Sequence, residues 1–323
     1  MQLNNYQKNI PFNDGIEIIA DLIDIGFTKP DATRHVALFF QMRRCFSLVQ
    51  HEIVGVSASV KKLKEDIWSN VFTHRMGWYL SYLWDEMEDF STLVLGPTGV
   101  GKTSVARVIG RSGFIPYDAS TKRFKENFSE IFQSINLSQF PPSLMESELF
   151  GHSKGAFTGA NEAHKGIFEM CNTHGSIFID ELGEIGEDLQ VKLLNVLQER
   201  TFTPVGSHER KKFSGRVIGA TNQDIHNLVR SGKFRSDLYY RLCSDIIEVP
   251  SLRCRLQEDS KELGIILKRL FHRVSSTVTN EIIEMTERNL VKSVGKDYAW
   301  PGNIRELEQA GRRMCISGRY DHA

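Results

Sequence analysis

Residues Ser91–Arg107 read STLVLGPTGVGKTSVAR, and this stretch decides the fold. An apolar strand is followed by a glycine-rich turn and then by a helix, and the turn, Gly96–Thr103, has the residue spacing of a phosphate-binding loop. Its three glycines let the backbone bend tightly, so that successive N–H groups and the N-terminus of the helix converge on a polyphosphate. Lys102 adds a positive charge, and Thr103 offers a hydroxyl of the kind that binds Mg²⁺ together with phosphate oxygens. The stretch therefore predicts a nucleotide-binding site at the end of a strand.

Composition and charge argue against several classes of protein, among them membrane proteins and disulfide-rich secreted proteins. The chain has 323 residues, with 40 Lys and Arg against 40 Asp and Glu, so no net charge draws it towards nucleic acid or a membrane. Its five cysteines are widely spread and lack a C-x-x-C pair, which favours reduced thiols over disulfides or a zinc site. No stretch approaches ~18 consecutive apolar residues, and the N-terminus lacks the charged-then-apolar layout of a signal peptide. We therefore expect a cytoplasmic protein with no membrane contact.

The hydrophobic pattern divides the chain into three parts. Residues 1–50 predict a short N-terminal helical region, with helices over 16–25 and 31–50, which is either a cap on the neighbouring domain or a regulatory sensor. Residues 51–250 predict the nucleotide-binding α/β subdomain, and residues 251–323 predict a helical lid. In the lid we expect helices over 257–274 and 280–294, and a last helix whose start is capped by Asn303 together with Glu306.

In the middle part, strands alternate with helices. Besides the strand before the phosphate-binding loop, we expect strands over 114–117, 134–137, 177–180 and 216–222, and a helix over 122–133. Such alternation is typical of an α/β fold with a parallel sheet and helices on both faces.

Polar residues at strand ends complete the predicted nucleotide site. The strand 177–180 ends in Asp180 and Glu181, at the carboxyl edge where open α/β sheets bind their ligands. We expect Asp180 to help hold Mg²⁺, and Glu181 to orient and polarise the attacking water. Asn222, at the end of strand 216–222, could contact the γ-phosphate or the water. Arg235 and Arg241 project from one short helical segment, where they either form surface salt bridges or, in a ring-forming ATPase, reach a neighbouring subunit's γ-phosphate.

A glycine-flanked insertion precedes the strand 177–180. Residues 148–152 read ELFGH and residues 155–160 read GAFTGA, with Phe157 and Thr158 carried between glycines. A phenylalanine left in solvent forgoes the ~1.5–3 kcal/mol that burial would provide. Phe157 is therefore expected either to fold back onto the protein or to meet a partner.

These residues resemble the central domain of the bacterial enhancer-binding proteins, the AAA+ activators of sigma-54 RNA polymerase. The motifs GAFTGA, ELFGH, GSIFIDEL, GATN, FRSDLYYRL and WPGNIREL all occur, within roughly residues 51–316. The resemblance implies an AAA+ P-loop NTPase whose parallel sheet is flanked by helices and followed by a small helical lid. It also implies a ring of about six subunits with ATP sites between neighbours, and it implies sigma-54 and RNA polymerase as partners.

The same resemblance implies a role for each matching residue. ATP is bound by Gly96, Pro97, Thr98, Gly99, Val100, Gly101, Lys102 and Thr103, with Arg305 as the second sensor. The catalytic set is Asp180, Glu181, Asn222 as first sensor, Arg235 and Arg241 acting in trans, and Asn136, which restrains Glu181 until the loop is raised. Mg²⁺ is held by Thr103 and Asp180, and sigma-54 is contacted by Gly155, Ala156, Phe157, Thr158, Gly159 and Ala160. Hydrolysis then switches that loop between two arrangements.

Most members of this family carry a C-terminal helix-turn-helix that binds DNA. Only 16 residues follow Leu307, so we expect no such domain in this chain. Either the sequence is truncated, or this member acts without DNA or reaches promoter DNA through a partner. Two other functions stay open: a ring-forming ATPase that remodels another protein client, and a nucleotide-gated regulatory module that binds without turnover. The Asp180–Glu181 pair favours turnover.

Overall fold

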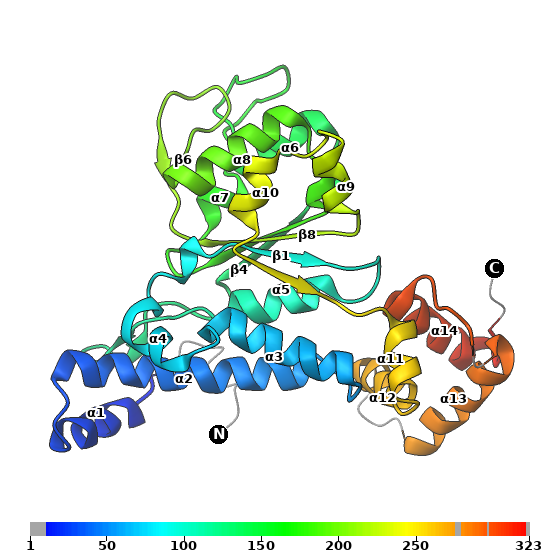
Figure 1. Cartoon of the computed structure of the whole chain (residues 1–323). Coiled ribbons are helices and arrows are strands. Elements are labelled where there is room, and N and C mark those ends of the chain that lie inside the picture. The colour runs from blue at the N-terminus through cyan, green and yellow to red at the C-terminus, as the bar shows by residue number, and fades with distance from the viewer. Residues whose placement is uncertain (1–10, 275–278, 296, 321–323) are drawn as a thin grey trace.

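The computed structural model describes residues 11–274, 279–295 and 297–320. At its centre lies a five-stranded parallel sheet in the order β4-β5-β8-β1-β9 (Figure 1). The strands are β1 (Thr92–Leu95), β4 (Phe132–Asn136), β5 (Ser176–Asp180), β8 (Arg216–Thr221) and β9 (Asp245–Glu248). The predicted parallel sheet is confirmed.

Helices cover both faces of this sheet, as the sequence predicts (Figure 1). One face packs against α6 (Pro142–Phe150), α7 (Ile167–Met170), α8 (Glu187–Glu199), α9 (Ile225–Arg230) and α10 (Ser236–Leu242). The other packs against α2 (Lys29–Glu52), α3 (Ala58–Phe72) and α5 (Lys102–Arg111). Successive strand residues alternate between the two cores: Ile177 and Ile179 belong to the first and Phe178 to the second.

The N-terminal helix α2 is part of the second core, whereas α1 (Asp14–Asp24) packs in a smaller cluster of its own with the start of α2 and Tyr117. The helix α1 packs on α2, and α2 packs on α5. Leu38, Cys45 and Val49 of α2 are buried in the same cluster as Val105 and Ile109 of α5. The helix α2 thus covers part of the neighbouring subdomain, and the role of residues 1–50 stays a prediction.

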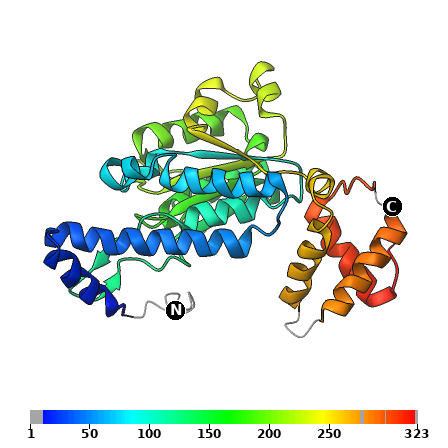
Figure 2. The same ribbon diagram turned by 60° about the horizontal axis from the view of Figure 1, so that its bottom comes forward.

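The C-terminal part is helical and has a core of its own, at one end of the molecule (Figures 1 and 2). It contains α11 (Leu252–Glu258), α12 (Glu262–Val274), α13 (Asn280–Val294) and α14 (Asn303–Ser317). The single helix expected over 257–274 is wrong, because α11 ends at Glu258 and α12 begins at Glu262. The earlier start of α11 is fixed by Ser251, whose hydroxyl accepts a hydrogen bond from the Cys254 N–H at 3.2 Å.

The helix expected over 122–133 is absent from the described structure. The segment instead contains β3 (Arg123–Phe124), which pairs with β2 (Tyr117–Asp118) in a separate antiparallel hairpin, and β4 then starts at Phe132. Asn127 stabilises the intervening turn, since its side-chain oxygen accepts hydrogen bonds from the Ser129 N–H at 3.1 Å and the Ser129 hydroxyl at 2.8 Å. The strand expected over 114–117 likewise supplies only Tyr117, outside the central sheet.

The remaining elements are short. They are α4 (Met76–Trp78), the π-helical turn η2 (Tyr79–Leu83), the 3₁₀ turns η3 (Met87–Asp89), η4 (Leu137–Gln139) and η5 (Leu182–Glu184), and the strand pair β6 (Thr201–Phe202) and β7 (Lys211–Lys212). None of the helices in the described ranges is both long and apolar enough to cross a bilayer.

Candidate functional site

The phosphate-binding loop joins β1 to α5. Gly96, Gly99 and Gly101 all have positive φ, at 149°, 79° and 104°, a region that favours glycine. A Cβ at Gly99 would lie 2.3 Å from the carbonyl oxygen of Gly302, so this position also lacks space for a side chain. The Lys102 ammonium donates to the carbonyl oxygens of Gly96 and Pro97, at 3.0 and 3.4 Å, which holds it over the loop. The predicted loop geometry is therefore present.

Asp180 lies at the carboxyl end of β5, as its strand predicts. Burial raises the pKa of its carboxyl, and the charges of Lys102 and Arg305 partly oppose that shift. Burial lowers the pKa of the Lys102 ammonium, and the negative charges of Glu181 and Asp180 partly oppose that shift. The structure thus brings the four predicted charged residues of the loop, the β5 edge and the lid into one electrostatic neighbourhood.

Glu181 is held in an unusual state. Its backbone is left-handed, with φ 57°, and its Oε2 atom is buried with no hydrogen-bond partner among the described residues. Burial and the neighbouring Asp180 carboxylate both raise the pKa of its carboxyl. Strained backbone and an unsatisfied buried oxygen are costly in a folded protein, and such features gather at functional sites. Glu181 is therefore built as an acceptor for a group that the protein itself does not supply.

Two asparagines flank this edge of the sheet. The Asn222 amide donates to the Thr98 hydroxyl at 2.9 Å, so the predicted first sensor touches the phosphate-binding loop. Asn136 ends β4 directly opposite Asp180. Its side-chain oxygen accepts from the N–H and hydroxyl of Ser138, and no hydrogen bond in the described part of the chain joins it to Glu181.

The start of α14 rests on the phosphate-binding loop. The Asn303 amide donates to the Thr98 carbonyl at 3.0 Å, and the Ile304 N–H donates to the Gly99 carbonyl, also at 3.0 Å. Arg305 is exposed near the start of α14, as predicted.

The predicted cap by Asn303 is wrong. Asn303 is the first helical residue, with φ 53°, and its side-chain oxygen accepts from the Leu252 N–H at 2.9 Å. Only Glu306 has the capping role, since its carboxylate accepts from the Gly302 N–H at 2.8 Å. The amide of Asn303 joins three segments instead.

Arg235 and Arg241 lie at the two ends of α10. The Arg235 guanidinium forms ion pairs with Asp237 at 2.8 Å and Glu187 at 3.7 Å. Arg241 donates to the Leu197 carbonyl of α8, at 3.1 and 2.8 Å. Among the described residues, no hydrogen bond or ion pair links either arginine to the phosphate-binding loop of its own chain.

The GAFTGA residues form a loop between α6 and α7. Its stem is closed by His152 and His164, whose backbones exchange hydrogen bonds at 2.9 and 3.0 Å, and its turn by the Gly155 N–H on the Ala160 carbonyl at 2.8 Å. Phe157 packs edge-on against the His152 ring, with centroids 4.9 Å apart, yet it is still 38% exposed. Phe157 is therefore partly folded back and partly available to a partner.

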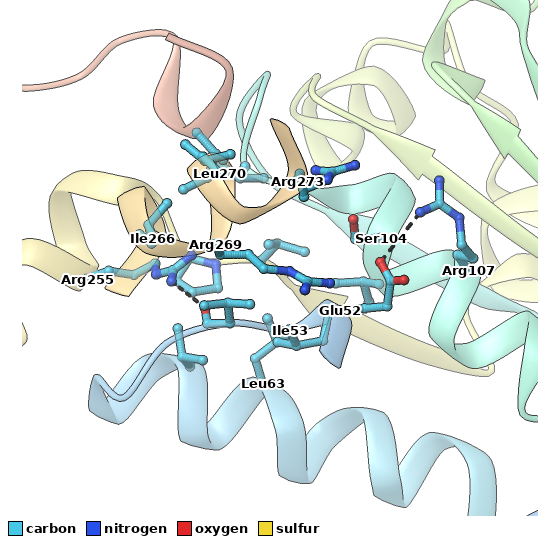
Figure 3. Close-up of a pocket in the computed structure, with 18 residues that line it drawn as sticks. Glu52, Ile53, Leu63, Ser104, Arg107, Arg255, Ile266, Arg269, Leu270 and Arg273 are labelled. Carbon is cyan, nitrogen blue, oxygen red and sulfur yellow. Dashed lines mark hydrogen bonds and ion pairs between the residues drawn. The ribbon is translucent and has the colours of Figure 1, made fainter. Parts of the chain in front are cut away.

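A cavity of about 190 Å³ beside the phosphate-binding loop was not predicted (Figure 3). Its walls come from the end of α2, from α5 and from the lid helix α12. They include Glu52, Ile53, Ser104, Arg107, Ile266, Arg269 and Arg273. Figure 3 shows Arg269 and Arg273 extending from α12 towards the side where Glu52 and Arg107 form an ion pair, at 3.6 Å. Its lining includes the apolar pair Ile53 and Val54, near the start of the predicted α/β subdomain.

A buried ion pair beside this cavity joins the first two lid helices. Arg255 of α11 and Glu262 of α12 lie 2.6 Å apart, and Arg255 also donates to the Val54 carbonyl at 2.6 Å. The Glu262 carboxylate accepts hydrogen bonds from the N–H groups of Val56 and Ser57. The segment 54–57 is thereby attached to the first two lid helices.

Comparison with known proteins gives consistent results. The family described as Sigma-54 interaction domain matches residues 85–248, about half of the chain. Regulatory protein AtoC of Escherichia coli (strain K12) is 38% identical over 226 residues, which cover 70% of this chain and 45% of AtoC. The transcriptional regulator NtrC of Azospirillum brasilense is 36% identical over 228 residues, covering 70% of this chain and 43% of NtrC. The chain thus spans less than half the length of these relatives.

The fold also matches solved structures. The crystal structure of NtrX from Brucella abortus in complex with ATP superposes with a TM-score of 0.61 at 22% identity, covering 92% of this chain and 58% of NtrX. A second NtrX structure, in complex with ADP, matches with the same TM-score and coverage.

Proposed function

This chain belongs to the Sigma-54 interaction domain family of transcriptional activators, and from this premise we propose that it is an ATPase that remodels sigma-54 RNA polymerase. In the proposed reaction, ATP hydrolysis drives the conversion of closed promoter complexes into open ones. The observation that carries the proposal is the GAFTGA loop, with Phe157 38% exposed, in the same chain as a phosphate-binding loop and a strand that leads into Asp180 and Glu181.

ATP would occupy the loop and the cavity beside it. The backbone N–H groups of Gly96–Thr103 and the N-terminus of α5 are arranged to hold the phosphates. The 190 Å³ cavity next to Val100 and Gly101 would take the nucleoside. Arg305, at the start of the lid, is close enough to Asp180 and Lys102 for its charge to act on both. It would sense the γ-phosphate from the lid.

The donor set also suits Mg²⁺. Thr103 offers a hydroxyl and Asp180 a partly buried carboxylate, both hard oxygen ligands. The phosphate oxygens of the nucleotide would supply further ligands. When bound, Mg²⁺ would neutralise charge on the phosphates.

Glu181 is our proposed base for hydrolysis. Its unpartnered Oε2 atom can accept a hydrogen bond from the attacking water, and its raised pKa improves its match to a proton-transfer role. Asn222, already on Thr98, would complete the contacts around the γ-phosphate. Asn136 lies at the end of the adjacent strand. Once its side chain gives up the hydrogen bonds from Ser138, it would restrain Glu181.

Each site would be completed by a neighbouring subunit. Arg235 and Arg241 have no described contact with their own phosphate-binding loop, and α10 presents them on one short helix. We propose that they act in trans within a ring of about six subunits, since head-to-tail contacts that close generate rings. An arginine supplied this way is worth ~10³–10⁵ in turnover.

The link from hydrolysis to the partner runs through the first core. The helices α6 and α7 flank the GAFTGA loop and are buried in the same cluster as β4 and β5. A change at Glu181 or Asn136 could therefore shift the loop and move Phe157 and Thr158 towards sigma-54. We retain the three parts, 1–50, 51–250 and 251–323, as the proposed domain division. Because its proposed partner is RNA polymerase, the chain would act in the cytoplasm.

A binding assay tests this proposal. The purified chain is mixed with sigma-54 in the presence of ATP, ADP, or ADP with aluminium fluoride as a γ-phosphate mimic. We expect a complex only with the mimic, and we expect Phe157→Ala to abolish it. The matched control is Phe46→Ala, since Phe46 is a 59% exposed phenylalanine on α2.

Two results would count against the proposal. If Phe157→Ala bound sigma-54 as well as the unaltered chain, the loop would not be the contact. Normal ATP turnover without any response from sigma-54 polymerase would point to another protein client.

A further inference from the structure

Gln190 is a buried polar residue to which neither the sequence analysis nor the proposed mechanism gives a role. It lies on α8, its side chain is 1% exposed, and it makes three hydrogen bonds. Its amide nitrogen donates to the carbonyl oxygens of Ile185, at 3.0 Å, and Lys233, at 2.9 Å. Its amide oxygen accepts from the backbone N–H of Arg235 at 2.8 Å. Both donors and one acceptor position of the amide are therefore used.

The three partners of Gln190 lie on two segments with different proposed tasks. Ile185 follows η5, the short turn that comes directly after Glu181. Lys233 and Arg235 directly precede α10, and Arg235 is its N-cap residue. One side chain thus joins the backbone that carries the proposed base to the backbone that carries the proposed trans-acting arginine.

The geometry points to Gln190 as the residue that positions Arg235 for a neighbouring subunit's nucleotide, and we propose that it couples this position to the hydrolysis segment of its own chain. The inference rests on the function proposed above. Because the Arg235 side chain is 36% exposed and its partners in the described structure are the surface carboxylates Asp237 and Glu187, its backbone anchor decides where the guanidinium can reach. The Gln190 amide supplies that anchor from the protein interior.

The same contact gives a route between neighbouring sites. A shift of the 182–186 segment, caused by nucleotide at Glu181, would move the Ile185 carbonyl to which Gln190 donates. Since the amide is buried and rigidly bonded, Arg235 would move with it. The nucleotide state of one subunit would then set the turnover of the next.

Substitutions at Gln190 test this role. Gln190→Met has nearly the same volume and removes all three hydrogen bonds, whereas Gln190→Glu keeps the acceptor for the Arg235 N–H and loses both donors. We expect ATP turnover to fall about 100-fold in Gln190→Met, the scale of a 1 Å misplacement, with unchanged nucleotide affinity. Gln198→Met is the matched control, since Gln198 is an exposed glutamine on the same helix. Should the methionine variant fold poorly by circular dichroism, the glutamate variant replaces it.

Mixed rings separate positioning from a merely structural role. A Lys102→Ala chain cannot turn over ATP itself but still offers an intact Arg235 to its neighbour. Mixed with Gln190→Met chains, it should restore turnover to about 10-fold or more above the sum of the two separate proteins. If Gln190 acted only on the fold of its own site, the mixture would show no gain, and the inference would be overturned. Unchanged turnover in both Gln190 variants would overturn it equally.

A second mixture distinguishes failure of this inference from failure of the proposed function. Arg235→Ala chains mixed with Lys102→Ala chains should also regain turnover. If this pair regains activity and the Gln190→Met pair does not, only the role of Gln190 is wrong. If the Arg235→Ala pair shows no gain either, the trans arrangement is wrong, and the role of Gln190 is lost with it.

Discussion

Asn303 of the lid donates a hydrogen bond to the carbonyl oxygen of Thr98 in the phosphate-binding loop, at 3.0 Å. The same side chain accepts from the Leu252 N–H at the start of α11, so one buried amide connects the loop to two lid helices. The lid is thus attached to the backbone that would hold the phosphates.

Asn303→Asp should weaken ATP binding. The carboxylate keeps the acceptor for Leu252 and tolerates the left-handed backbone, but it loses the donor to Thr98 and places a negative charge beside the phosphates. We expect the dissociation constant for a fluorescent ATP analogue to rise about 10-fold or more, the equivalent of ~1.4 kcal/mol. Asn280→Asp, at the exposed start of α13, is the control. Equal affinity of the two variants would show that the lid contact does not act on nucleotide.

Glu181→Gln should separate binding from turnover. The amide has the shape of the carboxylate but cannot accept a proton, so we expect turnover to fall by ~10²–10⁴. Affinity for ATP should be unchanged, because the loop contacts remain. Steady-state phosphate release and analogue titration on the same preparation test both points. Retention of full turnover would remove Glu181 from the mechanism.

Glu181→Gln should also change how the stability of the folded protein depends on pH. A carboxyl whose pKa is raised in the folded state, as in Glu181 and Asp180, contributes stability at pH values below its unfolded pKa. That contribution is lost as the pH rises through the folded pKa, so ionised Glu181 destabilises the nucleotide-free protein at neutral pH. We therefore expect Glu181→Gln to raise Tm more at pH 7 than at pH 4. Equal differences at both pH values would contradict the raised pKa.

Glu262→Ala should destabilise the protein strongly. Glu262 is fully buried and is paired with Arg255 at 2.6 Å, so its removal leaves an uncompensated buried charge. We expect the free energy of unfolding in urea to fall by about 3–5 kcal/mol. Asp66→Ala breaks the exposed Lys62–Asp66 pair and should have no measurable effect. Similar losses in the two variants would show that burial of the Arg255–Glu262 pair is unimportant.

The pH dependence of this pair has the opposite sign to that of Glu181. Burial alone would raise the pKa of Glu262, but the N–H groups of Ser57 and Val56 and the Arg255 guanidinium together lower it. The stability that ionised Glu262 gives to the folded state is therefore fully present above its unfolded pKa. It is lost as the pH falls through its folded pKa.

Local signals in the sequence were sufficient for the parts of the site that lie on one segment. The glycines at 96, 99 and 101 predicted the loop because each requires a positive φ. Asp180 and Glu181 were predicted because a buried strand must end at the ligand-binding edge. The strain at Glu181 and its unpartnered oxygen were not predictable, since they depend on the packing around it.

The predictions that failed depended on contacts between distant segments. Phe124, Phe128 and Ile131 have helical spacing, which explains the wrong helix over 122–133. In the structure, Phe128 and Ile131 instead form a small cluster with Ile115, and Phe124 packs against it. The cavity beside the phosphate-binding loop was missed for the same reason, because its walls come from segments near residues 53, 104 and 269.

The burial of α2 against α5 has a consequence for recombinant work on this protein. Leu38, Cys45 and Val49 cover Val105 and Ile109 directly behind the loop at Gly96–Thr103. A shortened version starting at His51 would leave that apolar surface bare, and it should aggregate or be degraded by proteases during expression. Helix α2 is therefore part of the core behind the phosphate-binding loop, and a signal received by the described N-terminal helices would have to act with α2 still packed in place.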